Sequence, residues 1–235
     1  YANIEALSFL NFILVGFVSM ATWFYVKPLL ESDKKGKESQ RDLLKFKKDA
    51  RIFNTLLNDG ECVEFQNLPD DQNVIIGNSD AIIKLVAVTN PLCGYCKPAF
   101  EQYDKILSRF GDQVSVSFKF NVFLKDVEGP GFILAQRWVE LYQKKGAEAA
   151  LQSMRDWFDK KDFDGWKSIY GLPENTEDLT VLENHKNWSL KNDINYTPAT
   201  ILKGQLFPKE YQLSDLIYFI DDLAPQKEEE LVESE

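Results

Sequence analysis

The sequence predicts an α/β fold in which helices cover both faces of a central mixed sheet, with one apolar helix ahead of it. Two observations support this prediction. Between residues 60 and 223, short β-branched runs alternate with helical periodicity, and the last pair of runs precedes a closing helix. A helical stretch at about residues 132–190 separates two of the predicted strands, so we expect a helical subdomain inserted into the sheet domain.

The apolar helix is predicted within residues 1–30, because no charged residue interrupts the run from Ala6 to Val26. A helix of this length spans about 31 Å, close to the thickness of the hydrocarbon core of a bilayer. The run lacks the polar stripe of a buried core helix. It also lacks the basic start and the small-residue cleavage site of a signal peptide. We therefore expect a transmembrane helix.

Residues 31–59 are expected to start as a polar linker at Ser32–Ser39 and to continue as an amphipathic helix at Arg41–Asn58. Strands are expected in the next domain, where β-branched and alternating residues occur. The predicted strands are Cys62–Phe65, Val74–Ile76, Ile82–Thr89, Val114–Phe123 and Ala199–Lys203. Three more predicted segments are a turn region at Gly165–Pro173, a closing amphipathic helix at Leu213–Leu223 and an acidic, disordered tail at 224–235.

A CxxC motif, Cys93-Gly94-Tyr95-Cys96, lies between the most strand-like segment of the chain and a helical pattern that stops at Gly111. We expect both cysteines in the first turn of that helix. Unpaired N–H groups and the positive end of the helix dipole lower the pKa of a thiol there. Because the thiolate is the nucleophile in disulfide exchange, Cys93 is predicted to attack and Cys96 to resolve the intermediate.

A structural disulfide and half of a zinc site are the alternatives for this motif. A zinc site needs four ligands, and besides the pair the chain has only Cys62 and His185, neither with paired spacing. We expect Cys62 to be buried in a strand and His185 to be a surface or packing residue. The net charge of −10 argues against nucleic-acid binding, which needs a basic face.

This order of elements, with the CxxC at a strand–helix junction and Thr197-Pro198 before a later strand, resembles the thioredoxin fold. The helical stretch inserted before Thr197-Pro198 makes it similar to the DsbA/DsbC branch, and the periplasmic isomerase DsbC also uses Cys-Gly-Tyr-Cys. The resemblance implies a cis peptide bond before Pro198. It also implies that the Thr197 backbone pairs with an extended substrate near Cys93, and that Thr197, Gly94 and Tyr95 tune the thiol. Tyr95 can equally be an exposed aromatic that packs on a partner.

A narrower resemblance involves a membrane helix followed by Ile194–Thr200 and Leu206–Tyr211. It looks like the C-terminal part of bacterial vitamin K epoxide reductase homologues fused to a thioredoxin-like domain. The resemblance implies that Ala6–Val26 is the last helix of a reductase bundle and that Tyr1 is a cut site. It also implies that upstream membrane cysteines exchange electrons with the pair. The quinone is then bound upstream, and this fragment itself binds no cofactor.

The lysines that follow the apolar run would, by themselves, place this side of the membrane in the cytoplasm. They are Lys27, Lys34, Lys35 and Lys37. A disulfide oxidant is expected on the other side. Upstream helices that set the topology would remove the conflict, so we expect a membrane-anchored, periplasmic catalytic domain.

The sequence thus predicts a membrane-tethered thiol–disulfide oxidoreductase that acts on the thiols and disulfides of exported proteins. One alternative is an isomerase or reductase of the DsbC kind, which Cys-Gly-Tyr-Cys and Thr-Pro favour and the lack of a visible dimerisation domain opposes. A second alternative is a non-catalytic thioredoxin-like interaction module.

Overall fold

The computed structural model describes residues 2–63 and 72–223, with side chains from residue 12 onward. The chain divides into two units, residues 1–49 and 50–235. Two predictions concern residues outside the described ones: the acidic tail at 224–235 and the second half of the strand candidate Cys62–Phe65. Of that candidate, Cys62 forms an isolated antiparallel bridge with Gln205.

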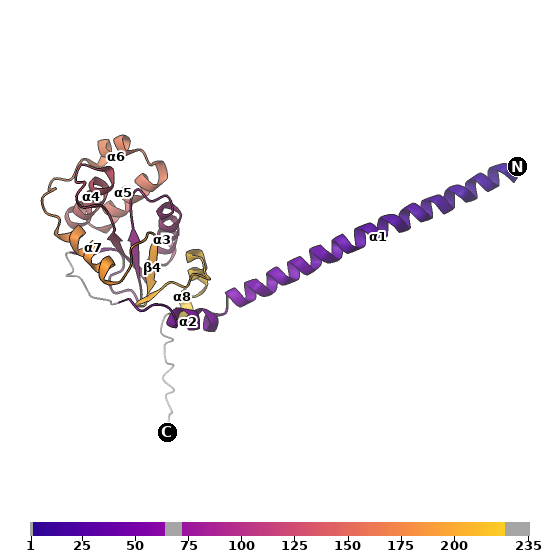
Figure 1. The fold of residues 1–235 in the computed structure, drawn as a ribbon, viewed down its shortest axis with the longest axis horizontal. Helices are drawn as coiled ribbons and strands as arrows, with labels where there is room; N and C mark the ends of the chain where they lie inside the picture. Colours follow the sequence, from indigo (N-terminus) through magenta and orange to yellow (C-terminus); the bar gives the residue numbers. More distant parts are fainter. Residues whose placement is uncertain (1, 64–71, 224–235) are drawn as a thin grey trace, which may run out of the picture. The chain divides into compact units, whose positions relative to one another are not determined.

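The first unit is dominated by a single helix, α1 (Ala2–Lys47) (Figure 1). Its part from Phe12 onward is long and apolar enough to cross a membrane, with exposed side chains. The linker predicted at Ser32–Ser39 is wrong, because the helix runs through it. Lysine, glutamate and glutamine favour helices, and ion pairs one turn apart support them, such as Lys37 with Asp33 at 2.7 Å.

The amphipathic helix predicted at Arg41–Asn58 is divided in two. α1 ends at Lys47, and α2 (Ala50–Asn58) begins the second unit. In α2, Phe53 and Leu57 are buried, whereas Phe46 in α1 is exposed. The apolar pattern therefore spans a boundary between two helices with different surroundings.

The second unit is built on a five-stranded sheet with strand order β1-β3-β2-β4-β5. β2 runs parallel to β3, and the other neighbouring pairs are antiparallel. The strands are β1 (Val74–Gly77), β2 (Ile83–Thr89), β3 (Val114–Phe120), β4 (Ala199–Leu202) and β5 (Gln205–Leu206). The predicted positions of β1 to β4 are confirmed within a few residues.

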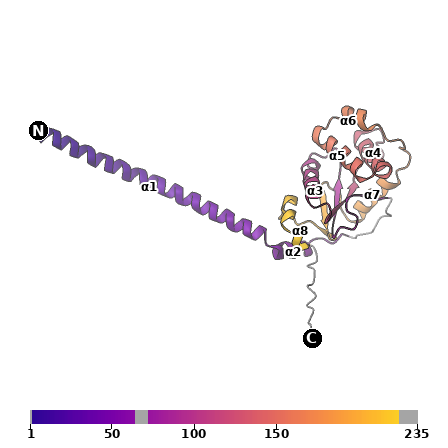
Figure 2. The ribbon, with the colours of Figure 1, turned by 180° about the vertical axis from the view of Figure 1, so that it is seen from behind.

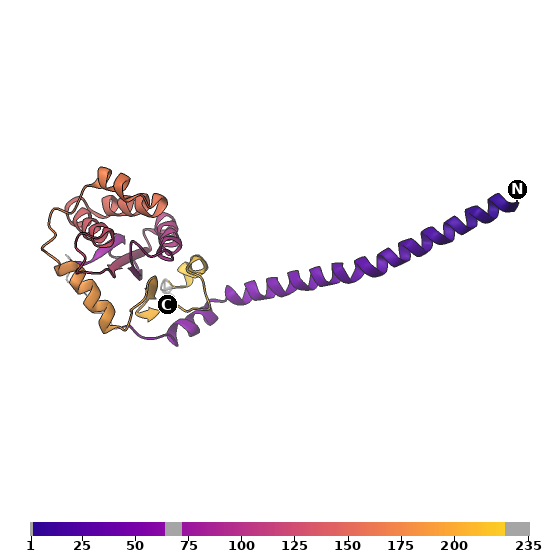
Figure 3. The same ribbon diagram turned by 45° about the horizontal axis from the view of Figure 1, so that its top comes forward.

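Helices lie on both faces of this sheet, with α3 (Cys96–Phe110) on one side and α7 (Thr180–Lys191) on the other (Figures 1 and 3). The alternation along β2 explains this arrangement, since successive side chains point to opposite faces. Leu85 belongs to the larger core with α3, and Val86 belongs to a smaller cluster with Trp188 of α7.

The helical subdomain predicted at about 132–190 is confirmed. Before α7 it contains α4 (Pro130–Lys145), α5 (Ala147–Lys160) and α6 (Phe163–Tyr170), and these three helices gather at one end of the unit (Figure 2). The turn region predicted at Gly165–Pro173 is therefore wrong for residues 165–170, which belong to α6. The Asp162 carboxylate accepts the Gly165 N–H and caps the helix. The buried Trp166 indole donates to the Ser153 carbonyl at 3.0 Å. This capping and packing stabilise a helix in spite of the low helix propensity of Gly165.

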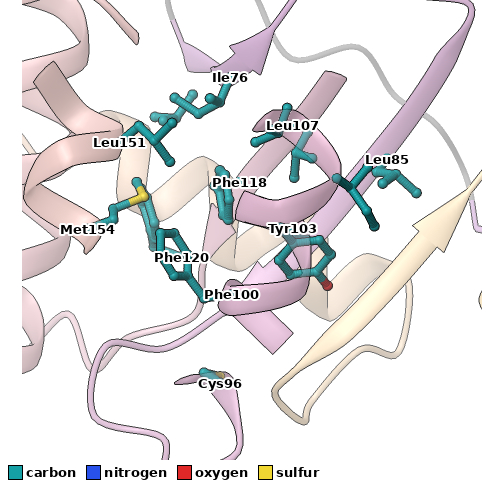
Figure 4. Packing of buried hydrophobic residues seen from close by; sticks show 14 of the residues in the cluster. Ile76, Leu85, Cys96, Phe100, Tyr103, Leu107, Phe118, Phe120, Leu151 and Met154 are labelled. Carbon is teal, nitrogen blue, oxygen red and sulfur yellow. The ribbon is translucent and has the colours of Figure 1, made fainter. Parts of the chain in front are cut away.

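The main core lies between α3, β3 and α5 (Figure 4). Cys96 lies at one end of this cluster, below Phe100. At the chain's C-terminal side, the predicted closing helix is a 3₁₀ helix, η2 (Leu213–Tyr218), followed by one α turn, α8 (Ile220–Leu223). Phe219, between them, stacks on Phe53 of α2 with ring centroids 4.2 Å apart. Phe219 thus lies at the junction of the two helices with its ring fully buried in the core.

Candidate active site

The CxxC loop lies at the carboxyl end of β2, where the chain turns into α3. Helix α3 begins at Cys96, so only Cys96 is in its first turn and the prediction for Cys93 is wrong. A tight turn holds Cys93 just before the helix, with the Cys96 N–H donating to the Cys93 carbonyl at 3.2 Å. Asn90 organises the start of the loop: its carbonyl accepts the Cys93 N–H, and its side-chain oxygen accepts the Leu92 N–H. Cys93 is half-buried and Cys96 is buried, and both are free thiols.

The Thr197-Pro198 segment faces the cysteines from the start of β4. Its peptide bond is cis, as predicted. The Cys93 thiol donates to the Thr197 carbonyl oxygen at 3.4 Å. Because β4 pairs with β2, the sheet itself brings this segment beside the CxxC loop. The structure therefore joins Cys93, Cys96, Thr197 and Pro198 at one site.

The two thiols differ in acidity. Burial acts to raise the pKa of Cys93, but hydrogen bonds from the Thr197 side chain, the Cys96 thiol and backbone N–H groups outweigh it, and the net pKa is lowered. For Cys96 burial dominates and raises the pKa, against hydrogen bonds from Thr89 and Asn90 that lower it. The half-buried sulfur is thus the better thiolate, and the buried one is held as a thiol.

Gly94 and Tyr95, the residues between the cysteines, are both exposed. A side chain at Gly94 would meet open space, so nothing there requires glycine for steric reasons. Tyr95 directly precedes α3 and is 81% exposed, which leaves its ring free of packing within the described residues. The ring of Tyr95 is thus exposed, while its backbone hydrogen bond to Cys93 lowers the pKa of that thiol.

A second support for the loop comes from the helical subdomain. The Pro91 carbonyl oxygen accepts two hydrogen bonds, from Trp157 Nε1 at 2.9 Å and from Lys161 Nζ at 2.6 Å. Neither Trp157 nor Lys161 is among the site residues that the sequence predicts. Nothing in the spacing around Pro91 points to residues about seventy positions away, so the sequence carries no signal for this contact.

The remaining candidates lie away from the pair or play a packing role. Cys62 is exposed, so the prediction that it is buried in a strand is wrong, because its bridge to Gln205 lies at the edge of the sheet. His185 of α7 is a packing residue, fully buried and hydrogen-bonded to the Phe120 N–H at the end of β3. A hollow of about 200 Å³ adjoins the site. It is lined by Asn90, Asn121, Val122, Phe123, Lys186, Asn195 and Thr197.

This arrangement suits thiol–disulfide exchange: a reachable thiolate, a resolving thiol three residues later and a backbone segment beside them. A family model described as thioredoxin (Thioredoxin_4) matches residues 70–222. The chain belongs to this thioredoxin family. With its CxxC pair, it is a thiol–disulfide oxidoreductase. A comparison with curated proteins gives no significant match.

Solved structures with a similar fold come from several bacteria. ScsC from Proteus mirabilis in a transitional conformation is 22% identical, with a TM-score of 0.55 over 85% of this chain and 93% of that chain. A periplasmic thioredoxin-like protein from Salmonella enterica serovar Typhimurium is 18% identical, with a TM-score of 0.54 over 68% and 94%. Oxidised BdbD from Bacillus subtilis is 16% identical, with a TM-score of 0.52 over 71% and 100%. At these identities the likeness concerns the fold.

Proposed function

We propose that this thioredoxin-family chain is a membrane-tethered oxidant of exported protein thiols. The observation that supports the direction of electron flow is the unequal acidity of the pair. Hydrogen bonds lower the pKa of Cys93 and burial raises that of Cys96. A stabilised thiolate stabilises the reduced form of the pair, so its disulfide takes up electrons readily.

In the proposed reaction, a substrate thiolate attacks the Sγ atom of Cys93 in the Cys93–Cys96 disulfide. The bond between the two cysteines breaks, Cys96 leaves and takes up a proton, and a mixed disulfide joins Cys93 to the substrate. A second substrate thiolate then attacks the substrate sulfur of that mixed disulfide. The substrate leaves with a new disulfide, and two electrons remain on the pair as the Cys93 thiolate and the Cys96 thiol.

The proposed tether is α1, whose apolar part from Phe12 onward can span a bilayer by length and composition. The reduced pair is proposed to pass its electrons to cysteines of a membrane domain that binds a quinone, in the arrangement of the vitamin K epoxide reductase fusions. The catalytic domain would then face the periplasm. Replacing Val15 and Val18 by Asp should release the chain from membranes at alkaline pH, because each central Asp costs about 2.5–3.5 kcal/mol. Ser39→Asp, outside the apolar part, is the matched control, and retention of the double variant would contradict the tether.

The deciding measurement is the reduction potential of the pair, equilibrated with glutathione buffers on the full chain in detergent micelles. A value of about −120 to −200 mV is expected for an oxidant or isomerase. A value near about −270 mV would mark a thioredoxin-like reductant and reverse the proposed direction. Failure to equilibrate reversibly would favour the interaction module.

The isomerase remains a second candidate because the loop carries Cys-Gly-Tyr-Cys. Recovery of activity from scrambled ribonuclease would support it. Oxidation of reduced ribonuclease without that recovery would support the oxidant.

A further inference from the structure

Lys161 lies beside the CxxC loop although it belongs to the helical subdomain. It follows α5 directly, and its backbone is left-handed with φ of 54°. Its N–H donates to the Trp157 carbonyl at 2.8 Å and closes the helix. Glycine or asparagine usually occupies this conformation, which costs free energy for a residue with a long side chain. The helix end nonetheless turns the lysine toward the site.

The Lys161 ammonium group is held from two sides. It lies 4.4 Å from the ring centroid of Phe158 and 5.0 Å from that of Trp157, which is cation–π geometry. On the other side it donates to the Pro91 carbonyl oxygen at 2.6 Å. Phe158 in turn stacks on Phe100 of α3, with centroids 4.6 Å apart. The charge is therefore fixed against the loop and the helix that carry the two cysteines.

We propose that Lys161 is a positioning residue that fixes a positive charge beside the Cys93–Cys96 pair and thereby favours the thiolate. The proposal rests on the thiol–disulfide exchange proposed above and deepens it, because a more stable thiolate makes the disulfide a stronger oxidant. The step that the charge of Lys161 favours is the loss of a proton from the Cys93 thiol to solvent. Lys161 stays protonated and takes no part in bond making.

The electrostatics agree with this geometry. Burial lowers the pKa of Lys161, and negative charge on Cys96 and on Cys93 raises it. An attraction that favours the charged lysine favours the charged sulfurs by the same interaction. The contact that places the ammonium group against the loop is its hydrogen bond to the Pro91 carbonyl, two residues before Cys93.

The other titratable groups around the cysteine pair bind different partners from those of Lys161 or lie elsewhere. Lys97 of α3 donates to the Asp159 carbonyl at 3.1 Å, and its charge lowers the pKa of Lys161. The Asp162 carboxylate caps α6. Tyr103 is buried deeper in α3, where burial raises its pKa, and Tyr95 is exposed. Among the described residues, Lys161 is the cation that contacts the rings of Trp157 and Phe158 and also the Pro91 carbonyl of the CxxC loop.

The test is the rate at which iodoacetamide alkylates Cys93 in the reduced full chain between pH 4 and 9, resolved by peptide mass spectrometry. Lys161→Met is expected to slow alkylation at pH 6 about tenfold and to shift the profile to higher pH. The same tenfold change in the oxidation equilibrium corresponds to a fall in reduction potential of about 30 mV. Lys161→Arg should restore most of the wild-type rate, because it keeps the charge and the stacking on the rings.

A further variant separates the charge at position 161 from charge elsewhere on the surface. Lys160→Met removes one exposed charge at the neighbouring position and should leave the profile unchanged.

The proposal is overturned if Lys161→Met stays within twofold of Lys160→Met, or if Lys161→Arg alkylates as slowly as Lys161→Met. Circular dichroism confirms that each variant is folded. Alkylation needs no redox equilibrium, so it decides the role of Lys161 even if the wild-type potential refutes the proposed function.

Discussion

The thiol of Cys93 lies 3.4 Å from the carbonyl oxygen of Thr197, a residue 104 positions further along the chain. The Thr197 side chain also hydrogen-bonds both sulfurs, and for each of them this bond lowers the pKa. Thr197, just before β4, therefore provides the backbone next to the nucleophile and also affects the acidity of both thiols.

Thr197→Val keeps the shape of the side chain and removes its hydroxyl group. The pKa of Cys93 should rise, because hydrogen bonds that favour the thiolate outweigh burial in the wild type. A hydrogen bond to a charged group contributes about 1.5–3 kcal/mol, so alkylation of Cys93 at pH 6 should slow at least about tenfold. Thr197→Ser keeps the hydroxyl and should react at nearly the wild-type rate. Equal rates for the two variants would contradict a role for the hydroxyl.

Cys93→Ser should abolish exchange with disulfide substrates, since Cys96 is buried and its pKa is raised. Cys96→Ser should instead accumulate mixed disulfides at Cys93, visible on non-reducing gels and by mass spectrometry. Cys62→Ser is the matched control and should turn over normally, because the exposed Cys62 lies outside the site. Normal turnover by Cys93→Ser would refute the assigned roles.

His185 should make the protein less stable as the pH falls. Its Nδ1 accepts the Phe120 N–H at 3.2 Å, so the ring is neutral and Nε2 donates to the Gln72 carbonyl at 2.9 Å. Burial, and then the charge of Lys119, lower its pKa to about 3. The unfolded chain therefore binds the proton first, and the stabilisation present above about pH 6.5 is lost towards pH 3, by about 1.4 kcal/mol per pH unit.

His185→Gln removes this titration, so the loss of stability between pH 6.5 and 4.5 should be shallower than in the wild type. Urea denaturation at several pH values measures both slopes. The carboxylates titrate in both proteins and cancel in the difference. Parallel slopes would show that His185 does not titrate on unfolding.

Phe53 joins α2 to the C-terminal end of the second unit. Its ring is fully buried, stacks on Phe219 and meets Tyr211 edge-on at 5.1 Å. Phe53→Ala should lower the free energy of unfolding by about 3–5 kcal/mol, because it removes buried aromatic surface and leaves a cavity. Phe123→Ala is the same change at a ring that is 80% exposed, and it should cost less than about 0.5 kcal/mol. Similar losses in the two variants would mean that α2 is not part of the core.

Much of the fold could be predicted because its strands and helices follow local patterns of apolar and polar residues. The alternation at 114–120 and the apolar run before the CxxC appear as β3 and β2, and the tryptophans of the helical stretch are buried. The prediction was wrong where a local turn signal in the sequence competes with capping and packing by neighbouring residues. Gly165 suggested a turn, yet the Asp162 cap and the buried Trp166 give a helix.

The candidate active site could likewise be predicted only in part. The residue types and the order Cys93, Cys96, Thr197-Pro198 were available from the sequence, because a CxxC after a strand and a Thr-Pro before another are local features that a sheet brings together. Only the tertiary structure placed Cys93 ahead of the helix and Lys161 on the Pro91 carbonyl. Periodicity records which face of an element is buried, whereas the partner that covers a loop is decided by packing between distant elements. The acidity of Cys93 depends on such partners, so the sequence determined which atoms react and the fold decided how readily.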